Sequence, residues 1–525
     1  ARVRPARHRA ARRGGMRELA EDAPLRARLA AGTSWTLGAQ AAGQLIHFAT
    51  AMGLARLVAP AEFGLFAMAV AVSGLLAMAA DRGLGAALIQ TPELDAPQVR
   101  AAQCLTLRAG LLLAALLALG GPLLGALYGE PFLRTLAPGL ALQVVLAASA
   151  SVPQALLARA LRLRTLALVE MTATVVACAA ALLLAWKGMG AHALVAQVVT
   201  VSLVASLGYH LASGLRPPLA SVLRPSRGGR RNAPAELRRF GRHLTGQRLL
   251  DYLVRHADDV LIGRFAGAAA LGFYQRAYHL MLLPVARVGD VASRVLFPAL
   301  ARLRQDPERA RALYLKAVRL IALASFPTMA GLFVVAEEAL FVLFGPVWVA
   351  AAPVLRVLCL VGLMQSVGTT AGVIWRAHGR SDEQLRFAWV AAASALLAYA
   401  VGIHWGALGV AWAYLLRNLG LTWFNFALPG RLIGLRYRDV FGACAGTLVC
   451  AGAMALVVAA LGATWLAGPA GPERLAGKVA SGALVYLAFA AAFRLQALDD
   501  LRELLRELRH GRRGSAPNAV QAAGA

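Results

Sequence analysis

Ionisable residues gather in one short segment of a chain that is otherwise strongly apolar. The segment 251–265 reads DYLVRHADDVLIGRF. Its first nine positions carry five acidic or basic residues: Asp251, Arg255, His256, Asp258 and Asp259. On a helical wheel, charged groups of this region fall within about a third of the circumference: Arg248, Asp251, Arg255 and Asp259, with Asp258 at the edge. Opposite charges at these spacings can pair along one helix face.

The next predicted helix carries a second charged face. Its members are Arg276, His279, Arg287, Asp290 and Arg294. Placing a charge of either face against lipid would cost ~3 kcal/mol or more. Both faces are therefore predicted to line the interior of a helix bundle or a water-filled cavity. The alternative for 243–265 is an amphipathic helix that lies on the membrane surface and never crosses it.

The rest of the chain shows why such charges are unusual here. Its 525 residues are 59% apolar with a mean hydropathy of +0.61. Apolar blocks of about 20 residues, the length that crosses a bilayer, recur from end to end. The chain is therefore predicted to be an all-α polytopic membrane protein with fourteen transmembrane helices. The predicted spans are 31–54, 62–81, 102–126, 132–157, 165–186, 190–213, 243–265, 269–292, 314–340, 350–375, 385–402, 405–428, 439–465 and 477–496.

Basic residues in the loops predict the orientation of these spans. Arginines are abundant before the first span and in every second loop after it. The intervening loops, such as KGMGAH at 187–192, are short and poor in charge. By the positive-inside rule, the basic loops and both termini are predicted to lie in the cytoplasm.

Composition and motifs exclude several other classes of protein. The net charge of +28 resides between the apolar blocks and not on one folded face, so nucleic acid is not an expected partner. The five cysteines are scattered without a CxxC pair, and no GxxxxGK[ST] run is present. Neither a metal, a cofactor nor a built-in ATPase is therefore expected.

The chain contains an internal repeat. The segment ARLVAPAEFGLF at 55–66 aligns with GRFAGAAALGFY at 263–274, and LYGEPF at 127–132 aligns with LFGPVW at 343–348. Each copy holds six spans, so both copies enter the membrane in the same direction. Two six-helix lobes related by a pseudo-two-fold axis along the membrane normal, with two further C-terminal helices, are predicted.

The repeat adds residues of the first span to the predicted cavity. At the offset between 55 and 263, three residues of the seventh span, Arg248, Tyr252 and Arg255, match Gln40, Gln44 and His47. The first helix of each lobe is thus predicted to carry a polar face, charged in the second lobe and milder in the first. This arrangement favours a water-filled cavity between the lobes.

These patterns divide the chain into six parts. They are a basic cytoplasmic tail (1–30), an N-terminal six-helix lobe (31–213), a basic cytoplasmic inter-lobe linker (214–242), a C-terminal six-helix lobe (243–430), two additional transmembrane helices (431–497), and a cytoplasmic amphipathic helix with a disordered tail (498–525). The amphipathic helix is predicted to lie on the inner membrane surface, with pairing to a partner as the alternative.

Three stretches resemble a known family. They are 54–90, 253–306 and 326–372, of which the middle one, with RHADD, LIGRF and LFPALARL, is the most specific. Over about 31–430 the chain resembles the multidrug/oligosaccharidyl-lipid/polysaccharide exporter superfamily, in particular its polysaccharide transporter branch of Wzx-like flippases. His256 departs from the pattern of this branch, which commonly has asparagine there.

The resemblance implies a function and a location. A Wzx-like flippase would move undecaprenyl-pyrophosphate-linked oligosaccharide repeat units across the bacterial inner membrane, for the biosynthesis of O-antigen, capsule or exopolysaccharide. Its expected partners are this lipid-linked substrate, membrane lipids and polysaccharide assembly proteins, and the chain is expected to act as a monomer.

Arginine suits such a cargo because its planar fork of donors binds phosphate. The predicted substrate cavity is lined by Arg248, Asp251, Arg255, Asp258, Asp259, Arg276, His279, Arg287, Asp290, Gln40, Gln44 and His47. The aspartates are predicted to partner the arginines while the cavity is empty. Rocking of the two lobes would expose the cavity to each side in turn.

Three alternative functions stay open. A lipid-linked peptidoglycan precursor flippase and a multidrug exporter belong to the same superfamily, although a drug exporter favours an acidic cavity. A membrane-embedded polysaccharide polymerase or ligase should carry a sizeable periplasmic loop with catalytic groups. Here the predicted outer loops are short, and Glu337 and Glu338 form only a carboxylate pair near a span end. A transporter and not an enzyme is therefore predicted.

The predicted topology can be checked with reporter fusions. A reporter joined at Gly228 should report the cytoplasm, because the basic 214–242 segment is predicted inside. A reporter joined at Gly345 should report the periplasm. Finding both reporters in the same compartment would contradict the predicted topology.

Overall fold

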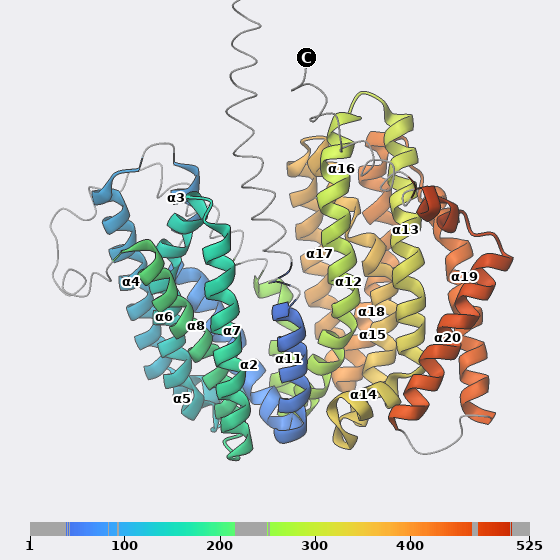
Figure 1. Ribbon diagram of the computed structural model, residues 1–525. Helices are drawn as coiled ribbons and strands as arrows, with labels where there is room; N and C mark the ends of the chain where they lie inside the picture. Colours follow the sequence, from blue (N-terminus) through green and yellow to red (C-terminus); the bar gives the residue numbers. More distant parts are fainter. Residues whose placement is uncertain are drawn as a thin grey trace, which may run out of the picture. The chain divides into compact units, whose positions relative to one another are not determined.

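The structure is a computed structural model built from helices (Figure 1). It describes residues 38, 40, 42–81, 83–91, 94–215, 249, 252–464, 471–503 and 506, with only the backbone of 286–295 and 464. Every regular element of these residues is an α- or 3-10 helix. The prediction of an all-α protein is confirmed.

The membrane spans follow the predicted pattern closely. Ten helical stretches of the described residues are long and apolar enough to cross a membrane. They account for eleven predicted spans, because the stretch Ser381–Ile433 contains two of them. The predicted spans 31–54 and 243–265 are described only in part, and 269–292 lies in a more polar helix, α12 (Ala268–Arg302). The chain is a multi-pass membrane protein.

The chain divides into two compact units, 1–256 and 257–525. The helices of unit 1 are α2 (Pro60–Asp81), α3 (Leu84–Gln90), α4 (Ala96–Leu119), α5 (Gly121–Tyr128), α6 (Leu133–Arg159), α7 (Leu163–Trp186) and α8 (Ala191–Ser213). In this unit α6 packs against α2, α4 and α8. A Cβ atom on Gly110 of α4 would lie 2.5 Å from that of Ala148, so this glycine permits the close approach of α4 and α6.

Unit 2 has more helices. They are α11 (Ala257–Ala266), α12, α13 (Pro307–Val334), α14 (Ala336–Phe344), η1 (Pro346–Ala351), α15 (Ala352–Gly368), α16 (Ala371–Ala377), α17 (Ser381–Gly402), η2 (Ile403–Trp405), α18 (Gly406–Gly430), η3 (Arg431–Ile433), α19 (Tyr437–Thr464) and α20 (Pro472–Ala492). Here α15 packs against α12, α13 and α18, as α6 does against its neighbours in unit 1.

The local structure of the two units supports the predicted duplication. Helix α2 begins at Pro60 and α12 at Ala268, the same offset that aligns 55–66 with 263–274. The short helices α5 and α14 both end at a glycine with positive φ, 74° at Gly129 and 105° at Gly345. Such φ values are strained for other residues, so both copies keep a glycine here, although ψ differs between them, 19° at Gly129 and 173° at Gly345.

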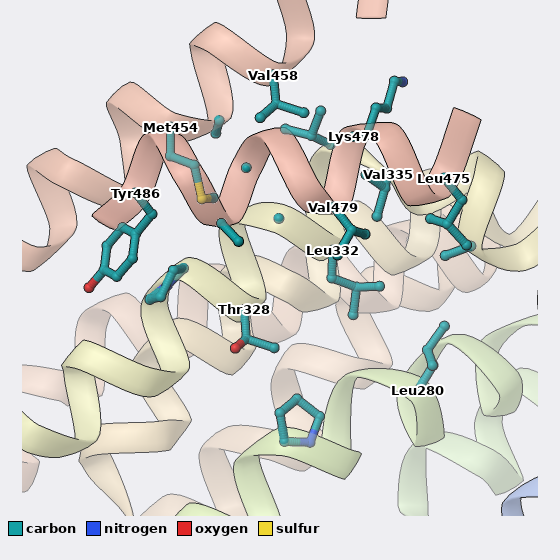
Figure 2. A pocket seen from close by; sticks show the side chains of 18 of the residues that line it. Leu280, Thr328, Leu332, Val335, Met454, Val458, Leu475, Lys478, Val479 and Tyr486 are labelled. Carbon is teal, nitrogen blue, oxygen red and sulfur yellow. The ribbon is translucent and has the colours of Figure 1, made fainter. Parts of the chain in front are cut away.

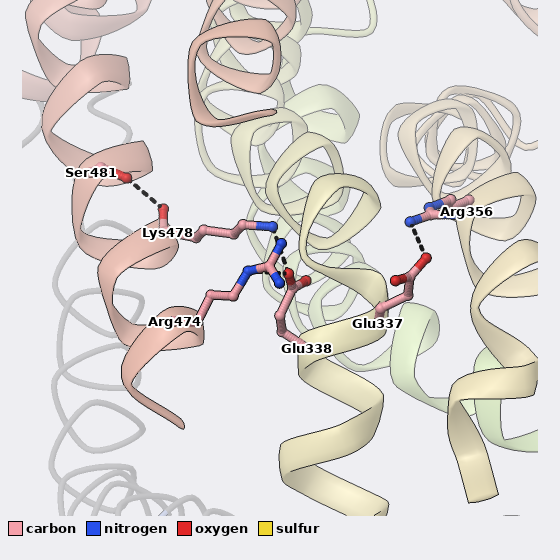
Figure 3. A network of polar contacts seen from close by, with 6 residues as sticks. All are labelled: Glu337, Glu338, Arg356, Arg474, Lys478 and Ser481. Atoms are coloured by element: carbon pink, nitrogen blue, oxygen red, sulfur yellow. Dashed lines mark hydrogen bonds and ion pairs between the residues drawn. The ribbon is translucent and has the colours of Figure 1, made fainter. Parts of the chain in front are cut away.

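An ion cluster joins α20, one helix of the predicted additional pair, to α14 (Figure 3). Glu338 Oε1 lies 2.6 Å from Lys478 Nζ and 3.1 Å from Arg474 Nε. The side chains of Glu338 and Lys478 are buried. The neighbouring Glu337 points instead to Arg356, at 2.8 Å, where half of its side chain is exposed. One buried carboxylate therefore joins α14 to α20.

Two ion pairs bind the segment after α20 to the N-terminal half of α13. Asp500 Oδ2 lies 2.6 Å from Arg319 Nε, and Glu503 Oε2 lies 2.6 Å from Lys316 Nζ. Leu495 is buried in the apolar core that α13 and α19 share. The first part of the predicted amphipathic helix thus packs on α13 of the same chain, and its contact with the membrane surface stays a prediction.

We expect Glu338→Gln to destabilise the protein. The variant removes the carboxylate that Lys478 and Arg474 both contact, and breaking a buried ion pair in this way costs about 3–5 kcal/mol. Thermal unfolding in detergent, followed by tryptophan fluorescence, measures the loss.

The matched control is Glu337→Gln. Its pair with Arg356 is exposed, so the expected cost is at most about 1 kcal/mol. Equal shifts of the unfolding temperature in the two variants would show that the buried cluster has no special role.

Candidate functional site

The described part of unit 1 contains four of the predicted cavity residues. Gln40, His47 and Arg255 are exposed, and Gln44 is half-buried. Arg248 and Asp251 lie outside the described residues. The helical turn that carries Arg255 is therefore accessible for a ligand.

Tyr252 anchors this turn to α2. Its hydroxyl donates a hydrogen bond to the carbonyl of Val70 at 3.2 Å. A Cβ atom on Gly74 would lie only 2.3 Å from the same hydroxyl oxygen, so a larger residue at 74 would displace the tyrosine. The predicted polar position at 252 is thus a structural contact within unit 1.

In unit 2, the predicted Asp258 and Asp259 are buried at the start of α11. Asp258 Oδ2 accepts a hydrogen bond from the hydroxyl of Tyr274 at 2.9 Å, and Asp259 Oδ1 accepts one from the amide of Gln275. Both donors belong to α12. The sequence analysis placed these aspartates in the bundle interior correctly, but it did not identify their partners on α12.

Arg276 faces a different part of unit 2. Its guanidinium lies over the rings of Phe344 and Trp348, at 5.7 and 5.8 Å from their centroids. Such cation–π contacts stabilise a cation without neutralising it. His279 is exposed, with its ring bonded to the carbonyl of Gln275 at 2.7 Å.

Two further predicted residues, Arg287 and Asp290, have side chains outside the described part of the structure. The pairing of the arginines with the aspartates stays a prediction. So does the assignment of all twelve residues to one cavity.

Tyrosines extend the polar interior of unit 2. Helix α11 packs against α12, α17 and α18. The rings of Tyr399 and Tyr414 meet edge to face at 5.7 Å, and the amide of Gln365 on α15 donates a hydrogen bond to the Tyr414 hydroxyl. Tyr274, the partner of Asp258, stacks with Tyr278 at 6.2 Å. Polar groups in membrane-spanning helices typically mark a path for water or cargo.

A polar pocket of 220 Å³ lies between α15, α17 and α18. Its polar lining residues are Gln365, Thr369, Arg417, Asn418, Thr422 and Asn425. Arg417 was not among the predicted site residues, although it is the one charged residue of the predicted span 405–428. A single charge in an apolar span could have identified Arg417 as a site residue, because charged residues inside membrane spans are rare.

An apolar pocket of 640 Å³ lies elsewhere in unit 2 (Figure 2). Its walls come from α12, α13, α19 and α20, through residues such as Leu280, Leu332, Met454 and Val479. Lys478, the partner of Glu338, also lines it. The polar pocket and the apolar pocket both lie within unit 2.

Comparison with known proteins identifies the family. The model of the family described as "Polysaccharide biosynthesis protein" matches residues 53–353. The chain belongs to this family. Two relatives cover most of it: the lipopolysaccharide biosynthesis protein WzxC of Escherichia coli (strain K12) and the teichuronic acid biosynthesis protein TuaB of Bacillus subtilis (strain 168).

These relatives are similar to the chain over most of their own length. WzxC is 27% identical over 395 residues, which are 74% of this chain and 78% of WzxC. TuaB is 29% identical over 416 residues, which are 78% of this chain and 83% of TuaB. The predicted resemblance to the polysaccharide branch is confirmed.

A solved structure shares the fold. The lipid II flippase MurJ in an inward closed conformation aligns with a TM-score of 0.66 at 13% identity, over 86% of this chain and 98% of MurJ. The fold is that of a two-lobed helical transporter. Together with the family, it confirms the prediction of a transporter and not an enzyme.

We expect Tyr274→Phe to lower the thermal stability. The variant removes the hydroxyl that donates to buried Asp258, and leaving a buried acceptor unsatisfied costs about 1–3 kcal/mol. Thermal unfolding in detergent measures the change. The control is Tyr437→Phe, because the half-buried Tyr437 ring contacts Phe426 and its hydroxyl has no hydrogen-bond partner among the described residues. A loss no larger than that of the control would contradict the importance of this bond.

Proposed function

We propose that this protein is a flippase that translocates lipid-linked oligosaccharide repeat units across the bacterial inner membrane for polysaccharide biosynthesis. The observation that carries the proposal is the polar interior of unit 2. Buried aspartates, four tyrosines and Arg417 lie among helices that otherwise face hydrocarbon. A protein that moves only apolar molecules has no need of such groups.

The polar interior suits the head of the proposed cargo. Sugar hydroxyls and phosphates cannot enter hydrocarbon unless other groups replace their bonds to water. Side chains such as Gln365, Tyr414 and Asn418 carry the donors and acceptors that could replace water. Exposed Arg255 and the aromatic-bound Arg276 carry charges that attract a pyrophosphate.

The apolar pocket suits the lipid chain of the cargo. Lipid tails are as apolar as leucine, so the pocket supplies a place for the chain and not a driving force. Its 640 Å³ volume between α12, α13, α19 and α20 accommodates part of a long isoprenoid chain. The chain could stay in this apolar environment while the head crosses.

The names of the relatives support a polysaccharide cargo. WzxC is named for lipopolysaccharide biosynthesis and TuaB for teichuronic acid biosynthesis. Undecaprenyl pyrophosphate as the carrier, and alternating exposure of a cavity by movement of the two lobes, complete the proposed mechanism. The likeness to MurJ concerns the fold, so a peptidoglycan precursor is the second cargo to test.

Deletion of the gene in its native bacterium tests the proposal. Loss of a surface polysaccharide, accumulation of its lipid-linked repeat unit in the membrane, and rescue by the intact gene are expected. Unchanged polysaccharide would contradict the proposal. Accumulation of lipid-linked peptidoglycan precursor would identify the alternative flippase, and drug sensitivity alone would identify an exporter of drugs.

Variants of Arg255 test the predicted cavity in the same strain. Arg255→Ala should abolish rescue without loss of protein from the membrane, because it removes both charge and fork. Arg255→Lys keeps the charge and should rescue partly. Arg264→Ala is the control, since Arg264 is exposed near the end of α11 and lies over the ring of Phe265, so its loss should leave rescue intact. Full rescue by a stably inserted Arg255→Ala variant would contradict a role of Arg255 in binding the cargo and leave it a structural role only.

A further inference from the structure

Arg417 is a membrane-embedded cation that donates hydrogen bonds to neutral acceptors among the described residues. It lies midway along α18, and its guanidinium donates three hydrogen bonds. Nε donates to Ser394 Oγ at 3.2 Å, Nη2 to the carbonyl of Ala391 at 2.5 Å, and Nη1 to Asn418 Oδ1 at 3.3 Å. These contacts hold the side chain in place but leave its charge uncompensated.

Within the described part of unit 2, the positive charge of Arg417 is not paired with a carboxylate. None of the ion pairs of the described residues includes Arg417. Of the five N–H groups of a guanidinium, two therefore have no acceptor among the described residues. A cation at membrane depth is costly unless an opposite charge or water reaches it. The arrangement favours an anionic ligand with two oxygen atoms.

A second, independent group in the same pocket also lacks a partner. Gln365 donates through its amide nitrogen to Tyr414, but its buried Oε1 accepts no hydrogen bond in the described structure. Gln365 lines the polar pocket together with Arg417. An unsatisfied buried acceptor calls for a donor such as a hydroxyl group. The pocket therefore offers one site for an anion and one for a hydroxyl.

The size of the pocket limits what can bind. Its 220 Å³ correspond to about seven water molecules, each of which occupies ~30 Å³ in the liquid. The space holds about one sugar ring of a larger cargo. A ring that bears both a carboxylate and hydroxyls offers the two kinds of group that the pocket lacks, whereas a fully ionised phosphate offers only acceptors.

We propose that the polar pocket between α15, α17 and α18 binds an acidic sugar residue of the cargo, with its carboxylate on Arg417 and a hydroxyl on Gln365. The inference rests on the proposed function for the identity of the cargo, and on the two unsatisfied groups for the site. Arg417 then selects repeat units that contain an acidic sugar. It acts separately from Arg255, which is proposed to attract the pyrophosphate.

Binding of small probes to the purified full-length protein tests this assignment. Saturation-transfer NMR titrations with glucuronate, glucose and inorganic pyrophosphate compare a carboxylate sugar, a neutral sugar and a phosphate. Glucuronate should bind at least about tenfold more tightly than glucose, the ratio that one charge-assisted contact supplies. Equal binding of the two sugars, or no binding of glucuronate, would overturn the proposal.

Variants assign the binding to the pocket. Arg417→Gln should weaken glucuronate binding about tenfold or more, and Arg417→Lys should weaken it less, because it keeps the charge but not the fork. Arg386→Gln is the matched control: it removes an exposed arginine of α17 and should change nothing. Glucuronate binding that survives Arg417→Gln, or pyrophosphate as the sole Arg417-dependent ligand, would overturn the acidic-sugar site.

A further variant keeps the test decisive if Arg417→Gln does not fold. Gln365→Glu places a carboxylate of the protein itself in the pocket, so it should raise the unfolding temperature and abolish glucuronate binding. Binding that persists in this variant would contradict the proposed site.

The binding test and the gene deletion fail independently. If the protein does not bind glucuronate but gene deletion abolishes the polysaccharide, the flippase proposal stands and the acidic-sugar pocket is overturned. If the protein binds glucuronate through Arg417 but gene deletion leaves the polysaccharide unchanged, the pocket stands and the flippase proposal is overturned.

Discussion

Inside a bilayer a polar group has no water to bind, so each one must be satisfied by the protein or by what the protein carries. Most polar groups of unit 2 obey this constraint through partners of their own chain. Asp258 has Tyr274, Asp259 has Gln275, and Glu338 has Lys478. Arg417 differs from these groups, because the three hydrogen bonds that it donates within the described part of the chain go to neutral acceptors. The paired carboxylates stabilise the fold, whereas the charge of Arg417 is proposed to bind a ligand.

The same constraint explains what could be predicted from the sequence. Hydropathy and length identify spans because a helix must cover the hydrocarbon with apolar side chains, and each of the fourteen predicted spans overlaps described helical residues. Breaks within spans were not predicted. The predicted span 314–340 is divided into α13 and α14, and 102–126 into α4 and α5. A break of one residue leaves the average hydropathy unchanged, so a search for long apolar blocks cannot detect it.

The sequence predicted the burial of particular side chains but not the residues that they contact. The spacing of Asp258 and Asp259 indicated an interior position, and both are buried. Their donors, Tyr274 and Gln275, lie sixteen residues further along, and only the packing of α11 on α12 brings them together. Arg417 produced no pattern because it stands alone in its span. A search for clustered charges overlooks a single charge, even though a single charge in lipid is the more demanding case.

The ties on α13 have a consequence for the apolar pocket. Helix α20 is bound at its start to α14 through Glu338, and the segment after its end is bound to α13 through the pair Arg319–Asp500. Walls fastened at both ends resist being pressed together. A pocket with such walls is expected to keep its volume while a lipid chain enters or leaves it.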